Sequence, residues 1–169
     1  MRVGLMADTH DRVPAVAEFV RQMAAAGVGM VLHAGDFCSP FCLRPFEESQ
    51  MTLAGVFGRN DGDREGLLSR AQAGYGAELF ESPHSFEMGG RRMLLIHDIG
   101  DVAQRSIEQH EIVIHGSTHT QEMKTRGDTL IVNPGEACGW LHGTPSAAIL
   151  DLDARTVEFL SLSGAPWQA

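Results

Sequence analysis

Residues 1–10 read MRVGLMADTH, an apolar run that stops at an aspartate and a histidine. A short apolar run of this kind is typical of a buried strand. Side chains two positions apart in a strand point the same way, so Asp8 and His10 can reach one ion together. The stretch therefore predicts a buried strand that delivers a carboxylate and an imidazole to a single point.

Later apolar runs end on the same residue types. Asp36 follows the second run and His97 the third, while a further run leads into a turn that holds Ser117 and His119 with the same spacing of two. The ends of such strands converge on one edge of an open α/β sheet. Carboxylates and imidazoles together suit divalent transition metals. We therefore expect one shared metal site, with Asp36 as the bridging carboxylate.

The first half of the chain alternates strands and helices. Strands are expected at 2–7, 30–33 and 51–56, and helices at 13–26, 40–48 and 64–73. A βαβαβ order predicts parallel strands joined by right-handed crossovers.

The second half favours hairpins. Paired strands are expected at 85–88 with 91–96, at 121–125 with 129–132 and at 147–152 with 156–162, and a helix at 101–109 with a strand at 111–115 lies between. Each pair flanks a short turn, for example Gly89-Gly90. The whole predicts a mixed sandwich of two sheets covered by helices.

Composition narrows the functional classes. The 169 residues predict one domain, 1–169, and the 43% hydrophobic content is typical of a soluble protein. A formal net charge of −9 disfavours a broad nucleic-acid surface. We expect no membrane span and no secretory leader. The three cysteines form no CxxC pair, which favours reduced thiols used for packing in a cytoplasmic protein.

Taken in order, the motifs resemble those of the calcineurin-like metallophosphoesterases, and most closely the small YfcE-like phosphodiesterases. The matching segments, spread over Met1 to Leu162, are Asp8-Thr9-His10, Gly35-Asp36, Gly58-Arg59-Asn60-Asp61, Ile96-His97, Gly116-Ser117-Thr118-His119 and Asn133-Pro134-Gly135. The resemblance implies an α/β (α+β) fold, a four-layer αββα sandwich of two mixed β-sheets flanked by helices.

The resemblance also implies a cofactor. Two divalent transition metal ions per chain are expected, with manganese first and iron, nickel or zinc as alternatives. One ion would be bound by Asp8, His10, Asp36 and His119. The second would be held by Asp36 and His97 with help from two other loops.

Those two loops depart from the family pattern. Arg59 stands where the family has a ligand asparagine, which moves Asn60 one place along, and Ser117 replaces a ligand histidine. In one interpretation Asn60 reaches the metal, and water or His115 replaces the lost imidazole. In a second, the second ion binds weakly. In a third, Arg59 takes over part of the second ion's charge, since a guanidinium is a good phosphate partner. Loss of hydrolysis remains a further outcome.

A third departure follows the Asn133 turn. Asn133 is a candidate substrate-binding residue, although a turn residue alone would explain it. Glu136 stands where the family often has serine. A carboxylate there would repel an anionic substrate unless it points away or binds metal. His142, in the loop after this turn, is a candidate substrate contact.

The favoured function is hydrolysis of small phosphodiesters. Bound ions would supply hydroxide, held against Asp36, and Arg59 would help to offset charge on the phosphoryl oxygens. The usual leaving-group histidine is missing, so Asp61 or water would donate the proton, and good leaving groups are expected to be preferred. The alternatives are a catalytically weak or inactive binding or scaffold protein with this fold, and a phosphomonoesterase. Association into oligomers is left open.

Overall fold

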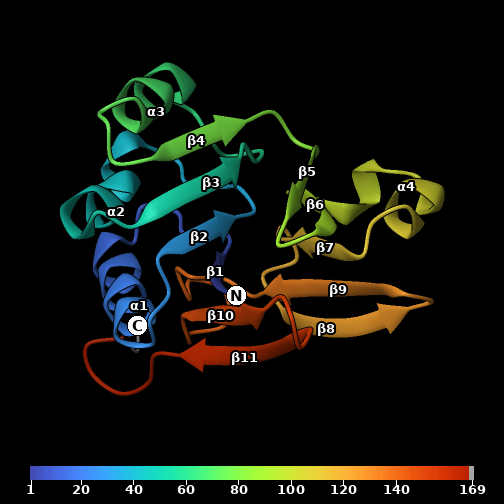
Figure 1. The fold of residues 1–169 in the computed structure, drawn as a ribbon. Coiled ribbons are helices and arrows are strands. Elements are labelled where there is room, and N and C mark those ends of the chain that lie inside the picture. Colours follow the sequence, from blue (N-terminus) through green and yellow to red (C-terminus); the bar gives the residue numbers. More distant parts are fainter. Residues whose placement is uncertain (168–169) are drawn as a thin grey trace.

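The computed structural model describes residues 1–167 of the chain. Two sheets pack face to face, with helices against their outer faces (Figure 1). The strands are β1 (Arg2–Met6), β2 (Met30–His33), β3 (Thr52–Val56), β4 (Ala77–Phe80), β5 (His84–Met88), β6 (Arg91–Ile96), β7 (Ile112–His115), β8 (Gln121–Arg126), β9 (Thr129–Pro134), β10 (Ser146–Asp151) and β11 (Thr156–Ser161). The α-helices are α1 (Val13–Ala25), α2 (Arg44–Ser49), α3 (Arg64–Ala71) and α4 (Gln104–Glu108), and the 3₁₀ turns are η1 (Pro40–Leu43) and η2 (Ile99–Asp101).

The six-stranded sheet has the order β11-β10-β1-β2-β3-β4. Its strands β1 to β4 run parallel, as the alternating pattern of the first half predicts for β1 to β3. Strand β10 joins β1 in antiparallel fashion and pairs with β11 as a hairpin. The sheet is therefore mixed, and the parallel ends of β1 and β2 lie at one edge.

The five-stranded sheet has the order β5-β6-β7-β9-β8. The expected hairpins β5–β6 and β8–β9 are present, while β6, β7 and β9 run parallel. The chain therefore builds a second mixed sheet whose parallel strands β6 and β7 also end together.

Three buried apolar clusters fill the space between the layers. The first lies between the helices α1 to α3 and the six-stranded sheet and includes Phe19 and Leu53. The second lies between the two sheets and joins Leu5 to Leu95. The third lies under α4 and includes Ile107. Since every element buries its apolar face against a neighbouring layer, the αββα sandwich is confirmed.

Two expectations about elements were wrong. Strand β4 was not foreseen, because Ala77–Phe80 is short, only half-buried and preceded by a glycine-rich turn. The helix expected at 101–109 begins only at Gln104. The Asp98 side chain accepts a hydrogen bond from the Gly100 N–H and closes η2, after which Val102 is extended. Within residues 1–167, no helix combines the length and the apolar character that crossing a membrane requires.

Candidate metal centre

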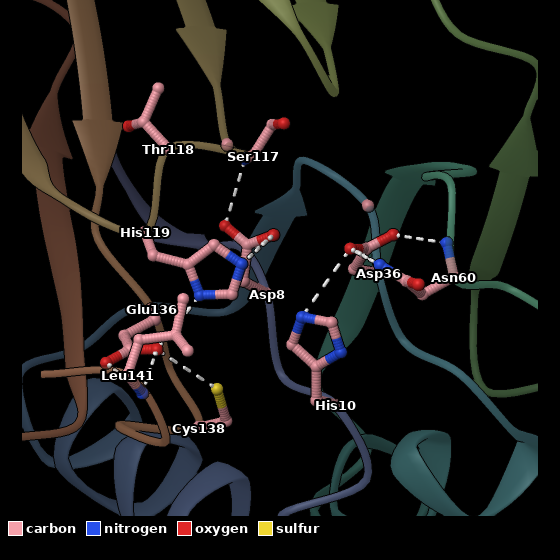
Figure 2. Close-up of polar contacts among 12 residues, drawn as sticks. Asp8, His10, Asp36, Asn60, Ser117, Thr118, His119, Glu136, Cys138 and Leu141 are labelled. Atoms are coloured by element: carbon pink, nitrogen blue, oxygen red, sulfur yellow. Dashed lines mark hydrogen bonds and ion pairs between the residues drawn. The ribbon is translucent and has the colours of Figure 1, made fainter. Parts of the chain in front are cut away.

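Loops at the ends of four strands bring the predicted ligands together. Asp8 follows β1, Asp36 follows β2, His97 follows β6, and His119 lies in the turn after β7. Ligand atoms of Asp8, Asp36 and His97 lie within 4.8 Å of one another, and all three side chains are buried. The same holds for His10, His119 and Cys138, of which the two histidines are partly exposed. Residues 111 positions apart in the chain thus meet in one place (Figure 2).

The separations between these groups suit shared ions. The Nε2 atoms of His10 and His97 each lie 3.5 Å from an Asp36 oxygen, and Nε2 of His119 lies 3.7 Å from Oδ1 of Asp8. These distances exceed an ordinary hydrogen bond. Donors about 2.0–2.2 Å from one ion are themselves separated by roughly 3.0–3.5 Å. The side chains are therefore spaced as neighbours around an ion.

Unpartnered buried atoms support the same conclusion. Oδ1 of Asp8 and Nε2 of His10 are buried without a hydrogen-bond partner among the described residues. A buried polar atom without a partner is costly, and a bound cation supplies that partner. The donors are carboxylate oxygens and imidazole nitrogens, which suit divalent transition metals. The residues present fit the metal centre that the resemblance implies.

The backbone around the ligands is strained and closely packed. Asp8, His10, Asp36 and His119 all have positive φ, between 38° and 62°. This left-handed region is uncommon for residues other than glycine, and strain of this kind concentrates at functional sites. A Cβ on Gly58 would lie 2.2 Å from Oδ1 of Asp36. Glycine at that position therefore allows the turn to close against the bridging carboxylate.

Two histidines are held by partners behind them. Nδ1 of His97 lies 2.8 Å from the backbone oxygen of Ala34, to which its N–H donates. Nδ1 of His119 lies 2.9 Å from a carboxylate oxygen of Glu136. A hydrogen bond at Nδ1 leaves the lone pair on Nε2 and fixes the ring orientation. Both rings therefore present a metal-binding nitrogen toward the carboxylates.

The Glu136 carboxylate is buried and engaged by hydrogen bonds. Its side chain is 1% exposed and accepts hydrogen bonds from His119 and from the backbone N–H groups of Leu141 and His142. Figure 2 shows the carboxylate between the His119 ring, Leu141 and Cys138. The structure thus gives Glu136 a place, because its buried carboxylate holds the ring of the candidate ligand His119.

Burial governs the protonation of the centre. Loss of water raises the pKa of Asp8 to about 6, opposed by nearby His119. Burial lowers the pKa of His10, against the attraction of Asp36. Burial alone would raise the pKa of Glu136, but hydrogen bonds from His119 and from backbone N–H groups outweigh it and lower that pKa. The centre therefore favours a neutral, ligating imidazole at His10 and an Asp8 carboxylate that a cation would stabilise.

Asn60 lies against the bridging carboxylate. Its backbone N–H donates to Oδ1 of Asp36 over 2.8 Å, and its side-chain amide donates to Oδ2 over 2.7 Å. Asn60 is thus in the centre, as expected, but its amide nitrogen orients Asp36. Whether its amide oxygen also binds metal stays a prediction.

Asp61 holds together the loops that follow β2 and β3. Its two carboxylate oxygens accept hydrogen bonds from the N–H groups of Asp36, Cys38 and Gly58, at 3.3, 2.8 and 2.6 Å. The side chain is buried. Because both oxygens are engaged by backbone, the structure supports a positioning role for Asp61 rather than the expected role as proton donor.

Arg59 faces the surface beside His97. Its guanidinium is 61% exposed and pairs with Asp98 at 2.8 Å and Asp101 at 3.2 Å. Arg59, His97 and Asp101 line a small hollow together. Two carboxylates thus already neutralise the guanidinium that was expected to offset charge at the second ion, and its contact with substrate stays a prediction.

The remaining candidates lie on strands β7 and β9 of the five-stranded sheet or in the turn after β7. The backbone N–H of Ser117 donates to Oδ2 of Asp8 over 3.1 Å, so this residue lies in the centre. His115 does not replace the lost imidazole, because its Nε2 pairs with Glu122 at 3.2 Å. Asn133 is fully buried and its amide donates to the Gly116 oxygen and the Thr118 hydroxyl. It therefore holds the turn that carries Ser117, which corrects the expected substrate contact.

Two functional residues were missed by the sequence analysis. Glu136 was expected to repel substrate unless it pointed away or bound metal, and nothing local in the sequence indicated its contact with His119. Cys38 was assigned to packing, yet its Sγ lies 3.3 Å from Nδ1 of His10. Its position two residues after Asp36, the spacing that links Asp8 to His10, was the signal that could have found it.

The centre has two unequal sides that share Asp36. The Asp8 side consists of Asp8, His10 and His119. The His97 side consists of His97 and Asn60, with Arg59 and Ser117 at the positions where the family has ligands.

Comparisons with known proteins show which family and fold this chain resembles. Residues 1–155 match the family described as the calcineurin-like phosphoesterase superfamily domain. Phosphodiesterase MJ0936 of Methanocaldococcus jannaschii is 30% identical over 158 residues, covering 92% of this chain and 95% of the relative. A solved structure described as a novel archaeal phosphodiesterase has a TM-score of 0.88 at 30% identity, covering 96% of this chain and 100% of that one. The E. coli phosphoesterase Yfce, with a TM-score of 0.69 at 16% identity and coverage of 96% and 98%, supports the fold alone.

Proposed function

The chain belongs to the calcineurin-like phosphoesterase superfamily, hydrolases that act on phosphate esters with divalent metal ions, and we propose that it hydrolyses small phosphodiesters. The observation that carries the proposal is the cluster of Asp8, Asp36 and His97 within 4.8 Å, with unpartnered buried donor atoms beside it. The name of the M. jannaschii relative supports the diester class.

The side chains of the centre have distinct tasks. Asp8, His10, Asp36 and His119 would hold one ion, and Asp36 with His97 a second. When bound, divalent ions supply hydroxide near neutral pH and offset charge developing on the phosphoryl oxygens. Asn60 orients the shared Asp36 carboxylate by two hydrogen bonds. No side chain of the 58–61 turn is free to protonate the leaving group, so water does so and substrates with good leaving groups react fastest.

Charge favours diesters over monoesters. A diester carries one negative charge near neutral pH, whereas a monoester carries nearly two. The chain has a net charge of −9, and the guanidinium groups of Arg59 and Arg64 beside His97 are already paired with carboxylates. The weaker His97 side supplies less positive charge when metal is scarce. A monoanionic substrate is therefore repelled less.

The native conditions follow from the same features. We propose manganese as the working metal, because carboxylates and imidazoles both suit it, with tight binding on the Asp8 side and weak binding on the His97 side. The unpaired cysteine pattern and the acidic charge support a cytoplasmic location and a small-molecule substrate rather than nucleic acid.

A pair of matched variants tests the proposal. With manganese present, wild-type protein should hydrolyse bis-(p-nitrophenyl) phosphate, and Asp36→Asn should lose more than about 100-fold in rate, because the shared ligand contributes several kcal/mol through metal binding. Asp128→Asn, an exposed carboxylate in a hairpin turn, should keep the wild-type rate. Equal rates in wild type and Asp36→Asn, with circular dichroism confirming both folds, would contradict the proposal.

A further inference from the structure

A cavity of about 400 Å³ opens directly beside the metal ligand His119. Its walls come from elements far apart in the chain: Thr120 and Gln121 at the start of β8, His142 and Thr144 in the loop before β10, and Ser161 at the end of β11. Ligand pockets typically measure about 300–1,000 Å³. The cavity is therefore large enough for one substituent of a small diester.

The cavity is tied to the metal centre by a single carboxylate. Glu136 accepts a hydrogen bond from His119 at 2.9 Å and another from the backbone N–H of His142 at 2.6 Å. One residue thus fixes both the ligand and the opposite wall. A group seated in the cavity would consequently be held at a set position relative to a phosphoryl group at the ions.

The lining carries no lysine, arginine, aspartate or glutamate, and it exposes more apolar than polar surface. Its polar groups are hydroxyls, the amide of Gln121 and the imidazoles of His119 and His142. An anionic group would find no lysine or arginine there, whereas a group with an apolar face and hydroxyls would find both apolar contacts and hydrogen-bond partners. The chemistry of the walls matches an uncharged substituent that combines a flat apolar part with a sugar, as a nucleoside does.

We propose that this cavity binds the non-leaving substituent of the diester, and that this substituent is an uncharged sugar-like group such as a nucleoside. The inference rests on the proposed function, since it places the group on a phosphodiester. It adds the substrate class and names Thr144 and Ser161 as specificity-determining residues.

Two esters that share a leaving group test the proposal. Thymidine 5′-(p-nitrophenyl) phosphate and methyl p-nitrophenyl phosphate release the same p-nitrophenolate, so the difference in kcat/KM reports the other substituent. The nucleoside ester should have a kcat/KM at least about tenfold higher, as expected for two or three added hydrogen bonds. A ratio near one in wild-type protein would overturn the inference while leaving the proposed function intact.

Filling the cavity should remove the preference. Thr144→Trp and, from the opposite wall, Ser161→Trp should each reduce the ratio at least about fivefold by occupying the space; both positions are exposed, so the fold should tolerate the change. Thr125→Trp, exposed at the far end of β8, is the control and should keep the wild-type ratio. An unchanged ratio in both cavity variants would overturn the inference. Absence of turnover of either ester would overturn the proposed function, and the inference with it.

Discussion

The two sides of the metal centre differ in the number of metal-binding side chains that they offer. On the Asp8 side, every residue type that the family uses is present, and His119 is locked by a buried carboxylate. On the His97 side, one imidazole is locked just as firmly by the Ala34 carbonyl, but Arg59 and Ser117 stand in place of two donors. The comparison teaches that the orientation of a ligand and the number of ligands are separate requirements. The His97 side keeps a well-oriented imidazole but has fewer metal-binding side chains than the family pattern.

The largest difference between the two sides is expected in metal binding when one histidine is removed from each side in turn. His119→Ala should weaken tight metal binding by more than about 100-fold, beyond the upper end of the loss expected for a partner behind a ligand. His97→Ala should leave one tightly bound ion per chain, because the Asp8 side is untouched. Metal analysis after dialysis measures both. If the two variants lose metal equally, the sides are not unequal as described.

The partner of His119 should matter nearly as much as a ligand. Glu136→Gln keeps the shape but weakens the hold on Nδ1, and manganese affinity should fall about 10–100-fold. Glu122→Gln is the matched control, because Glu122 contacts His115, which lies outside the centre. Isothermal titration calorimetry of both variants checks this. Similar affinities in the two would show that Glu136 acts only in packing.

Restoring a donor should strengthen the weak side. Ser117→His supplies an imidazole at a position whose backbone already contacts Asp8, and histidine tolerates positive φ better than a β-branched residue. The manganese concentration for half-maximal activity should fall about tenfold, equivalent to 1.4 kcal/mol. Ser117→Ala, which adds no donor, should not lower that concentration. A fall of equal size in Ser117→Ala would point to loop relaxation instead.

Lowering the pH should weaken metal binding on the Asp8 side, by a smaller factor than the substitutions above. Burial raises the pKa of Asp8 to about 6 in the metal-free chain, so protons compete with metal for this carboxylate below that pH. The direction is loss of affinity as pH falls, by about fourfold at pH 5.5 for one group of pKa 6. Metal titrations between pH 5 and pH 8 measure the effect. A constant affinity across this range would contradict it.

Much of the architecture was predictable from local patterns. The apolar run before Asp8, the alternation of strands and helices, and the hairpin turns predicted two mixed sheets, the parallel strands of the first half and the three hairpins. The strand order within each sheet, such as β10 beside β1, was not predicted. Strand β4 escaped, because a short half-buried edge strand carries little periodicity. The early start assigned to α4 failed for a different reason: the Asp98 side chain closes a separate turn ahead of it.

The sequence predicted which residues form the candidate site better than it predicted what each of them contacts. The strand-end rule placed Asp8, Asp36, His97 and His119 together, and the structure agrees. It could not assign partners, so Asp61 was expected to donate a proton and Asn133 to bind substrate, where the structure shows buried hydrogen bonds to backbone groups. A polar residue beside a motif gives the same sequence pattern whether its side chain faces the substrate or hydrogen-bonds to a loop backbone.

The sequence by itself determined which donor types stand at strand ends, because the alternation of apolar and polar residues is local and sets where each strand stops. Only the tertiary structure decided what each side chain touches. Arg59 pairs with residues about forty positions away, and Glu136, which follows β9, contacts His119, which precedes β8. Such pairings depend on how separate layers pack, and a hydrogen bond or ion pair forms only when packing brings the two groups within a few ångströms.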